Sequence, residues 1–153
     1  MADTKAETLE NVTLLADFAP DERQDLEKRC AWRHYGANEQ IIDRDSDSGD
    51  VYFVVAGEVR IVNYSYSGRE VSYDDIGAGG FFGELAAIDG KPRSATVVTL
   101  KKTIVASLSP EALREAILDH PRLALAIMQR LVAIIRGSTD RIMDLSTLGA
   151  YSR

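Results

Sequence analysis

Short segments rich in β-branched and aromatic residues follow one another between residues 31 and 108, with glycines at their ends. Such segments predict strands, and glycine supplies the tight turns and positive φ angles that the corners between strands require. Residues 51–55 are almost continuously apolar, which predicts a deeply buried strand. The predicted strands span residues 40–43, 51–55, 58–63, 70–74, 95–99 and 103–108. This spacing is typical of a compact antiparallel barrel or jelly roll, so a mostly β chain is predicted.

Helices are predicted N-terminal to these strands. One is expected over residues 8–16. A second should begin at Pro20, because proline at the first helical position is followed by the acidic residues Asp21 and Glu22. We therefore divide the chain into an N-terminal helical segment (1–30), a β-barrel (31–108) and C-terminal helices (109–153).

Helices are also predicted C-terminal to the strands. Ser109 can cap a helix in which Pro110 takes the first position. This helix should end near His120, because a proline disfavours helical backbone at the residue before it. Pro121 then opens a last helix that extends to about Thr147.

The last predicted helix has an apolar seam whose positions alternate in steps of three and four residues. A helix of about 27 residues would be about 40 Å long, more than one small barrel can cover. A homodimer that pairs these helices is therefore predicted. The polar Ser138 within the seam either sets the register of the pair or faces a ligand. The seam consists of Met128, Leu131, Ile135, Ser138, Ile142, Leu145 and Gly149.

The composition limits the partners of the chain. A length of 153 residues is enough for one domain with its own core. The net charge of -6 leaves no overall basic surface for nucleic-acid phosphates. The first ten residues lack the pattern of a secretory signal, and the apolar stretches are too short to span a membrane. We therefore expect a cytoplasmic protein that contacts neither DNA nor a membrane through these residues.

The sequence contains few residues that could hold a metal. Cys30 is the single cysteine, so a disulfide framework and an iron-sulfur centre are excluded, and a buried or half-buried free thiol is expected. His34 and His120 lie in unrelated segments and lack the spacing found in metal-dependent barrel enzymes. No metal site is predicted.

The densest signal for function lies in residues 79–95. Its glycines let the backbone approach a ligand, and the amides that open a short helix after Phe82 form an anion site. The guanidinium of Arg93 can reach the same anion, and the hydroxyl of Ser94 adds a donor beside it. Glu84 would repel a phosphate but can accept a hydrogen bond from a sugar hydroxyl. Phosphate and sugar together predict a nucleotide.

Phe82-Gly83-Glu84-Leu85-Ala86, followed by Arg93-Ser94-Ala95, resembles the phosphate-binding cassette of cyclic nucleotide-binding domains. Upstream, Gly36, residues 39–42 and residues 52–59 are similar to the barrel strands and turn glycines of this family. The resemblance covers about residues 12–153, and it is to the N-terminal sensor domain of transcription factors related to the cyclic AMP receptor protein and the fumarate-nitrate regulator. It implies a double-stranded β-helix (jelly-roll) barrel with N-terminal helices and a long C-terminal dimerisation helix.

The resemblance also implies roles for single residues. The cassette supplies backbone amides around Gly83, while Glu84 accepts the ribose 2′-hydroxyl. Arg93 contacts the cyclic phosphate. In regulators of this kind, adjacent hydroxyl residues on the dimer helix contact adenine, one of them from the partner subunit, and Ser138 and Thr139 match those positions. The candidate ligand-binding residues are Phe82, Gly83, Glu84, Leu85, Ala86, Arg93, Ser94, Ala95, Ser138 and Thr139.

The resemblance also bears on which nucleotide is bound and on which process the sensor controls. Ser94 stands where relatives that prefer cGMP often have threonine, which favours cAMP and leaves cGMP open. The resemblance implies a ligand that changes the pairing of the dimer helices and thereby controls a DNA-binding helix-turn-helix domain, which these residues do not include. Residues 146–153 resemble the hinge of longer relatives, so a truncated regulator is favoured over a free-standing module that acts on a protein partner.

The sequence argues against two other functions. Relatives with the same fold sense other effectors, such as haem ligands or oxygen through iron-sulfur clusters, but they commonly lose the residues that Glu84 and Arg93 retain. An enzyme is not expected, because Ser94 has no histidine at a suggestive spacing and metal ligands are absent. The acidic pair Asp74 and Asp75 is interpreted as a solvated turn.

Overall fold

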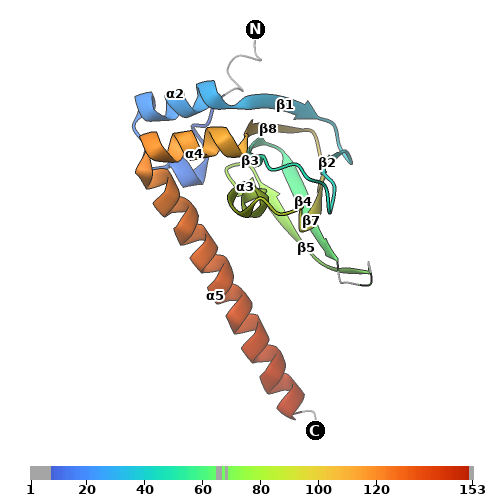
Figure 1. Cartoon of the computed structure of the whole chain (residues 1–153). Coiled ribbons are helices and arrows are strands. Elements are labelled where there is room, and N and C mark those ends of the chain that lie inside the picture. Colours follow the sequence, from blue (N-terminus) through green and yellow to red (C-terminus); the bar gives the residue numbers. More distant parts are fainter. Residues whose placement is uncertain (1–7, 65–66, 68, 152–153) are drawn as a thin grey trace.

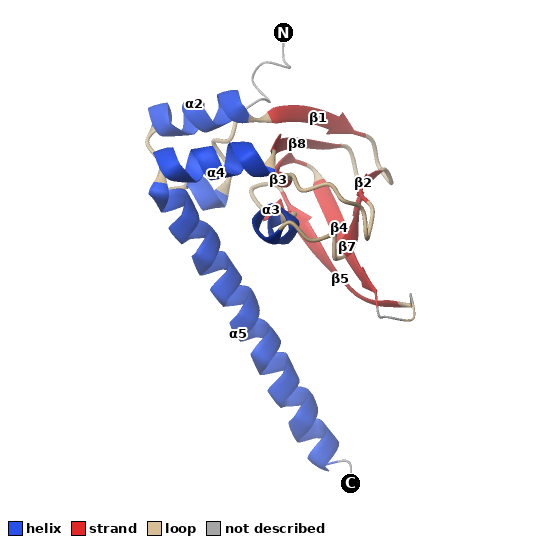
Figure 2. Cartoon of the chain, viewed as in Figure 1, coloured by secondary structure: helices blue, strands red, loops and turns tan. Residues whose placement is uncertain are grey.

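Eight strands in two antiparallel sheets form the body of the described part of the chain, and helices cover one side of it (Figures 1 and 2). The structure is a computed structural model that describes residues 8–64, 67 and 69–151. The jelly-roll barrel with flanking helices is therefore confirmed. One sheet has the order β1-β8-β3-β6, formed by Ala31–Tyr35, Thr103–Leu108, Val51–Ala56 and Phe81–Phe82. The other has the order β2-β7-β4-β5, formed by Gln40–Ile42, Ala95–Thr99, Glu58–Tyr64 and Glu70–Gly77.

Strand β3 contributes to two hydrophobic clusters, one on each of its faces. Val51 and Phe53 belong to a cluster that joins this sheet to the helices. Tyr52 and Val54 belong to a second cluster, which lies between the two sheets. Because side chains alternate across a strand, a strand covered on both faces needs a continuous apolar run. The apolar run at residues 51–55 has this explanation.

The predicted helix over residues 8–16 is wrong. This stretch forms only the 3-10 turn η1 (Thr13–Leu15), which follows an extended Val12. The amide and the hydroxyl of Thr13 both donate to the carbonyl of Gly79, at 3.0 Å each. These long-range bonds fix the segment against the barrel, so tertiary contacts override the local preference for a helix.

The other helices begin where they were predicted. Helix α2 is Pro20–Arg29, and α4 is Pro110–Asp119. The hydroxyl of Ser109 accepts a hydrogen bond of 3.1 Å from the amide of Ala112, as expected for a cap. Helix α4 ends before His120, and α5 (Pro121–Tyr151) follows it directly and is a few residues longer than predicted.

Helix α5 is anchored to the body of the molecule only near its start. Leu123 and Ile127 are buried, whereas the helix further along projects away from the strands (Figure 1). Leu131, which was predicted to lie in the pairing seam, packs partly against the chain's own core. The exposed apolar stripe of the described part contains Met128 and Ile135 of the predicted seam, together with Leu125 and Val132. None of the described helices is long and apolar enough to cross a membrane.

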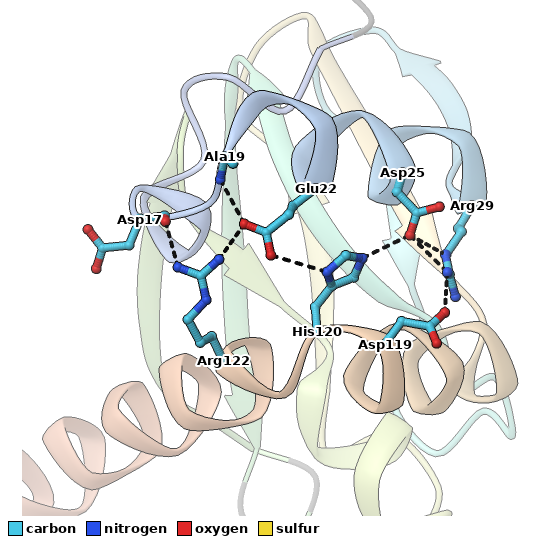
Figure 3. Close-up of polar contacts among 8 residues, drawn as sticks. All are labelled: Asp17, Ala19, Glu22, Asp25, Arg29, Asp119, His120 and Arg122. Atoms are coloured by element: carbon cyan, nitrogen blue, oxygen red, sulfur yellow. Dashed lines mark hydrogen bonds and ion pairs between the residues drawn. The ribbon is translucent and has the colours of Figure 1, made fainter.

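A polar network joins α2 to the point where α4 meets α5 (Figure 3). The two ring nitrogens of His120 face two carboxylates of α2. Nε2 lies 2.9 Å from Oδ2 of Asp25, and Nδ1 lies 3.5 Å from Oε2 of Glu22. Three further ion pairs belong to the network: Arg29 with Asp25, Arg29 with Asp119, and Arg122 with Glu22. The network therefore fixes the direction in which α5 leaves the body of the molecule.

Candidate functional site

The cassette begins with a glycine that no other residue could replace without strain. Gly83 precedes the short helix α3 (Glu84–Asp89) and has a left-handed backbone with φ 86. A Cβ atom at this position would lie 2.8 Å from the carbonyl oxygen of Asp50 and 2.9 Å from Nη1 of Arg93. Gly83 therefore permits both the turn into α3 and the close approach of the arginine.

The side chain of Arg93 is buried and held in a fixed orientation. The residue is only 3% exposed. Its Nη1 donates to the carbonyl of Gly83 at 3.0 Å, and its Nη2 donates to the carbonyl of Asp50 at 2.7 Å. Its Nε donates to the hydroxyl of Ser48 at 3.0 Å. The main chain is also fixed, because the amide of Arg93 donates to the carbonyl of Ser46 at 2.9 Å.

The acceptors around Arg93 are all uncharged. No ion pair joins the guanidinium to a carboxylate in the part of the chain that the structure describes. Burial lowers the pKa of Arg93, since the charged form loses hydration. A guanidinium has five N–H groups, so these bonds leave one on each terminal nitrogen. The site therefore presents a buried cation that has no ion pair and has donors to spare, which favours an anion.

Glu84 lies beside this cation at the start of α3. Burial raises the pKa of its carboxyl, and the charges of Arg130 and then Arg93 act in the opposite direction. Arg130 comes from α5, so the carboxylate faces both the cassette and the long helix. Glu84 can accept a hydrogen bond from a ligand hydroxyl in this position.

These residues line a cavity of about 220 Å³ between the cassette, the second sheet and α5. All eight cassette residues named from the sequence, from Phe82 to Ala86 and from Arg93 to Ala95, lie on its wall. The remaining wall residues are Ile42, Ile61, Asn63, Asp74, Val97 and Ile134. The volume is below the roughly 300 Å³ at which ligand sites usually begin.

A second cavity adjoins the first and extends it along α5. Its volume is about 330 Å³, and its wall includes Arg130, Ala133 and Gly137 of α5. The two cavities share wall residues from the second sheet, the cassette and α5, namely Ile61, Asp74, Phe82, Glu84 and Ile134. A ligand that begins at Arg93 can therefore continue into the second cavity.

The two hydroxyl residues expected on α5 are not brought to the cassette in the described structure. Thr139 is exposed and lines neither cavity, and the side chain of Ser138 lies outside what the structure describes. Ile134, one helical turn before Ser138, lines both cavities instead. Gly137, the neighbour of Ser138, lines the second one.

Several residues of the cavity wall were not predicted from the sequence, and the acidic pair Asp74 and Asp75 does not form the predicted turn. Asp74 and Asp75 lie in strand β5 rather than in a turn. Arg60 donates to both carboxylate oxygens of Asp75, at 2.8 and 3.0 Å, while Asp74 faces the ligand cavity. Alternation along β4 could have identified Asn63, which shares a face with Val59 and Ile61 but is polar.

The described residues contain no group of three or more histidine, cysteine, aspartate or glutamate side chains that could hold a metal ion. Cys30 is a partly buried free thiol, as predicted. Burial, together with the charge of Glu27, raises its pKa to about 12, so it is not a reactive thiolate.

Several known proteins with similar sequences are named as cAMP-activated or cAMP-dependent regulators. The chain is 27% identical over 125 residues to the cAMP-activated global transcriptional regulator CRP of Haemophilus influenzae, a stretch that covers 81% of this chain and 56% of that protein. It is 33% identical over 106 residues to a cAMP-dependent protein kinase regulatory subunit of Aspergillus fumigatus, covering 69% of this chain and 25% of that protein. The chain thus spans about half of the regulator and a quarter of the kinase subunit.

A similar solved structure and a matching family model indicate the same group of proteins. The catabolite activator protein of Thermus thermophilus superposes with a TM-score of 0.81 at 26% identity, covering 87% of this chain and 62% of that one. The family described as "Cyclic nucleotide-binding domain" matches residues 32–120, which include the whole cassette. The chain therefore belongs to the family of cyclic nucleotide-binding domains.

Proposed function

We propose that this chain is the cAMP-binding sensor of a bacterial-type transcription regulator and that it has no enzymatic activity. The observation that carries the proposal is Arg93, a residue that is 3% exposed and whose guanidinium is bonded only to neutral acceptors. A cyclic phosphate bears one negative charge and two exocyclic oxygens, which match the two remaining N–H groups. Such a ligand compensates the buried cation.

The other cassette residues have complementary roles in this proposal. Glu84 accepts the ribose 2′-hydroxyl, and the amide of Ala95 and the hydroxyl of Ser94 lie beside the phosphate. Phe82, Leu85 and Ala86 form the wall around Gly83. The preference for cAMP over cGMP rests on Ser94. When two chains pair through α5, Ser138 and Thr139 contact the base, one of them from the partner subunit.

The signal is transmitted through α5. We expect two chains to pair along the exposed apolar stripe of α5, because a helix of 31 residues is far longer than the segment that the barrel covers. The nucleotide lies between the cassette and α5, so it binds one arrangement of the two helices more tightly and shifts the equilibrium toward it. In a longer protein, this shift would control a DNA-binding helix-turn-helix domain.

A second candidate function has the same ligand but acts on a different target. The similarity to a protein kinase regulatory subunit supports a module that acts on a protein partner in the cytoplasm. A sensor of a different effector with the same fold is less favoured, because both Glu84 and Arg93 are present and line one cavity.

Calorimetric titration of the purified chain with cAMP, cGMP and 5′-AMP tests the proposal. We expect cAMP to bind most tightly, and 5′-AMP to bind weakly because its dianionic phosphate is not held in the ring. Chromatography of the mixture should return cAMP unchanged. Absence of cAMP binding, or formation of AMP, would contradict the proposal.

A further inference from the structure

One carboxylate lies on the inner face of the second sheet, where the other described side chains are mostly apolar. In the register of β4 and β5, Val59 is opposite Ile76 and Ile61 is opposite Asp74. Because directly opposed residues point to the same face, Asp74 lies on the face that carries the core residues Val59, Ile61 and Ile76. Asp74 itself is exposed, so its carboxylate stands on this face without being buried among the apolar side chains.

The carboxylate of Asp74 has no partner of its own. No hydrogen bond or ion pair joins its side chain to another group in the described part of the chain. Its neighbour Asp75 differs in this respect, because Arg60 holds both of its carboxylate oxygens. Asp74 lines both cavities and is accessible to whatever occupies them.

The position of Asp74 relative to the cassette identifies the part of a nucleotide that would meet it. In the proposed function, on which this inference rests, Arg93 holds the phosphate and Glu84 the ribose. The base must then extend into the space shared by the two cavities, whose wall includes Ile61 of the sheet and Ile134 of α5. These two apolar side chains suit the faces of a purine ring, and Asp74 stands among them as a polar group.

We propose that Asp74 takes part in recognition of the base by accepting a hydrogen bond from its exocyclic amino group. An ionised carboxylate is only an acceptor, so it favours a base that presents N–H donors and disfavours one that presents only acceptors. The ligand class is therefore a cyclic nucleotide with an aminopurine base. Asn63, on the same face and the same cavity wall, can serve the ring nitrogens of that base because its amide both donates and accepts.

The test compares Asp74→Ala with the matched control Asp75→Ala, using cAMP and the 3′,5′-cyclic phosphate of purine riboside, which lacks the 6-amino group. We expect Asp74→Ala to weaken cAMP binding about tenfold, as for a lost hydrogen bond to a charged group, and to change binding of the analogue less than about twofold. Asp74→Asn, which keeps one acceptor oxygen, should lie between the wild type and Asp74→Ala. Asp75→Ala should leave both affinities near those of the wild type, because Asp75 lines only the second cavity and Arg60 holds both of its carboxylate oxygens.

Two outcomes would overturn this inference. One is an unchanged cAMP affinity in Asp74→Ala, and the other is an equal loss for both ligands, which would indicate a distorted cavity rather than a lost base contact. A thermal melt of each variant accompanies the titrations, and Asp74→Ala should melt like the wild type because the carboxylate has no partner in the fold. Failure of the wild type to bind cAMP would instead contradict the proposed function, so the two failures are distinguishable.

Discussion

Nη1 of Arg93 donates a hydrogen bond of 3.0 Å to the carbonyl of Gly83, whose left-handed backbone opens the cassette helix. The arginine is therefore oriented by the same residue that lets the chain turn into α3. The conformation of one glycine and the direction of one guanidinium depend on each other.

Gly83→Ala should disturb both stability and binding. An alanine here has a positive φ, which costs about 1 to 2 kcal/mol, and its Cβ would collide with the carbonyl of Asp50 and with Arg93. Gly90→Ala is a matched control, since Gly90 has φ 72 but no atom within 4 Å of the added Cβ. Chemical denaturation and cAMP titration should show a larger loss of stability in Gly83→Ala, and a loss of affinity in that variant alone. Equal behaviour of the two variants would contradict this account of the turn.

Much of this fold could be predicted because local signals and tertiary structure agree. The strands at residues 95–99 and 103–108 have the predicted bounds, and Ser109 and Pro110 start α4 as expected. Strand β1 was missed because Arg33 and His34 interrupt its apolar character, and β6 because it has only two residues. Both pair with strands distant in sequence, which a local pattern does not reveal.

The candidate site was predicted less completely than the fold, because part of its wall comes from segments that are distant from the cassette in sequence. The cassette residues are close in sequence, so a motif finds them. Ile61, Asn63 and Asp74 reach the cavity only through the pairing of β4 with β5, and Ile134 only through the docking of α5. Apart from the carbonyl of Gly83, the neutral acceptors around Arg93 come from residues 46–50, which have no recognisable motif.

Acid should weaken the joint between α2 and α5. Hydrogen bonds to Glu22 from Arg122 and from the amide of Ala19 lower its pKa from 4.5 to about 2. Because the folded-state pKa is depressed, this contribution to the free energy of unfolding is complete above about pH 4.5 and is lost as the pH falls toward 2. Urea unfolding from pH 6 to pH 3 should show a smaller acid loss in Glu22→Gln than in the wild type or in Asp21→Asn. The difference should shrink at high salt, since Glu22 and Arg122 are near solvent.

His120 should be the residue that most strongly couples α2 to the start of α5. Its hydrogen bond is the largest cause that holds the pKa of Asp25 below its ordinary value, so His120→Ala should raise that pKa. The same variant should lose about 0.5 to 1.5 kcal/mol of unfolding free energy for the lost bond, plus the lost packing against Phe18. NMR titration of the Asp25 carboxyl, with Asp21 as an internal reference, measures the shift. An unchanged pKa would mean that the imidazole does not bond to Asp25 in solution.

The exposed stripe of α5 should mediate pairing. Ile135 is 63% exposed, and a charge there would be buried in a paired helix at high cost. Sedimentation equilibrium should find a dimer for the wild type and for Arg136→Glu, and a monomer for Ile135→Glu. A monomeric wild type at high micromolar concentration would contradict dimerisation through α5.

The central claim is that Arg93 binds the cyclic phosphate, and calorimetric titration of Arg93→Ala with cAMP tests it most directly. Arg60→Ala is the control, because the side chain of Arg60 lines neither cavity and pairs with Asp75 instead. The account predicts a loss of about 2 to 5 kcal/mol in Arg93→Ala, or about thirtyfold to several thousandfold in Kd, with little change in Arg60→Ala. A folded Arg93→Ala protein that binds cAMP with wild-type affinity would contradict it.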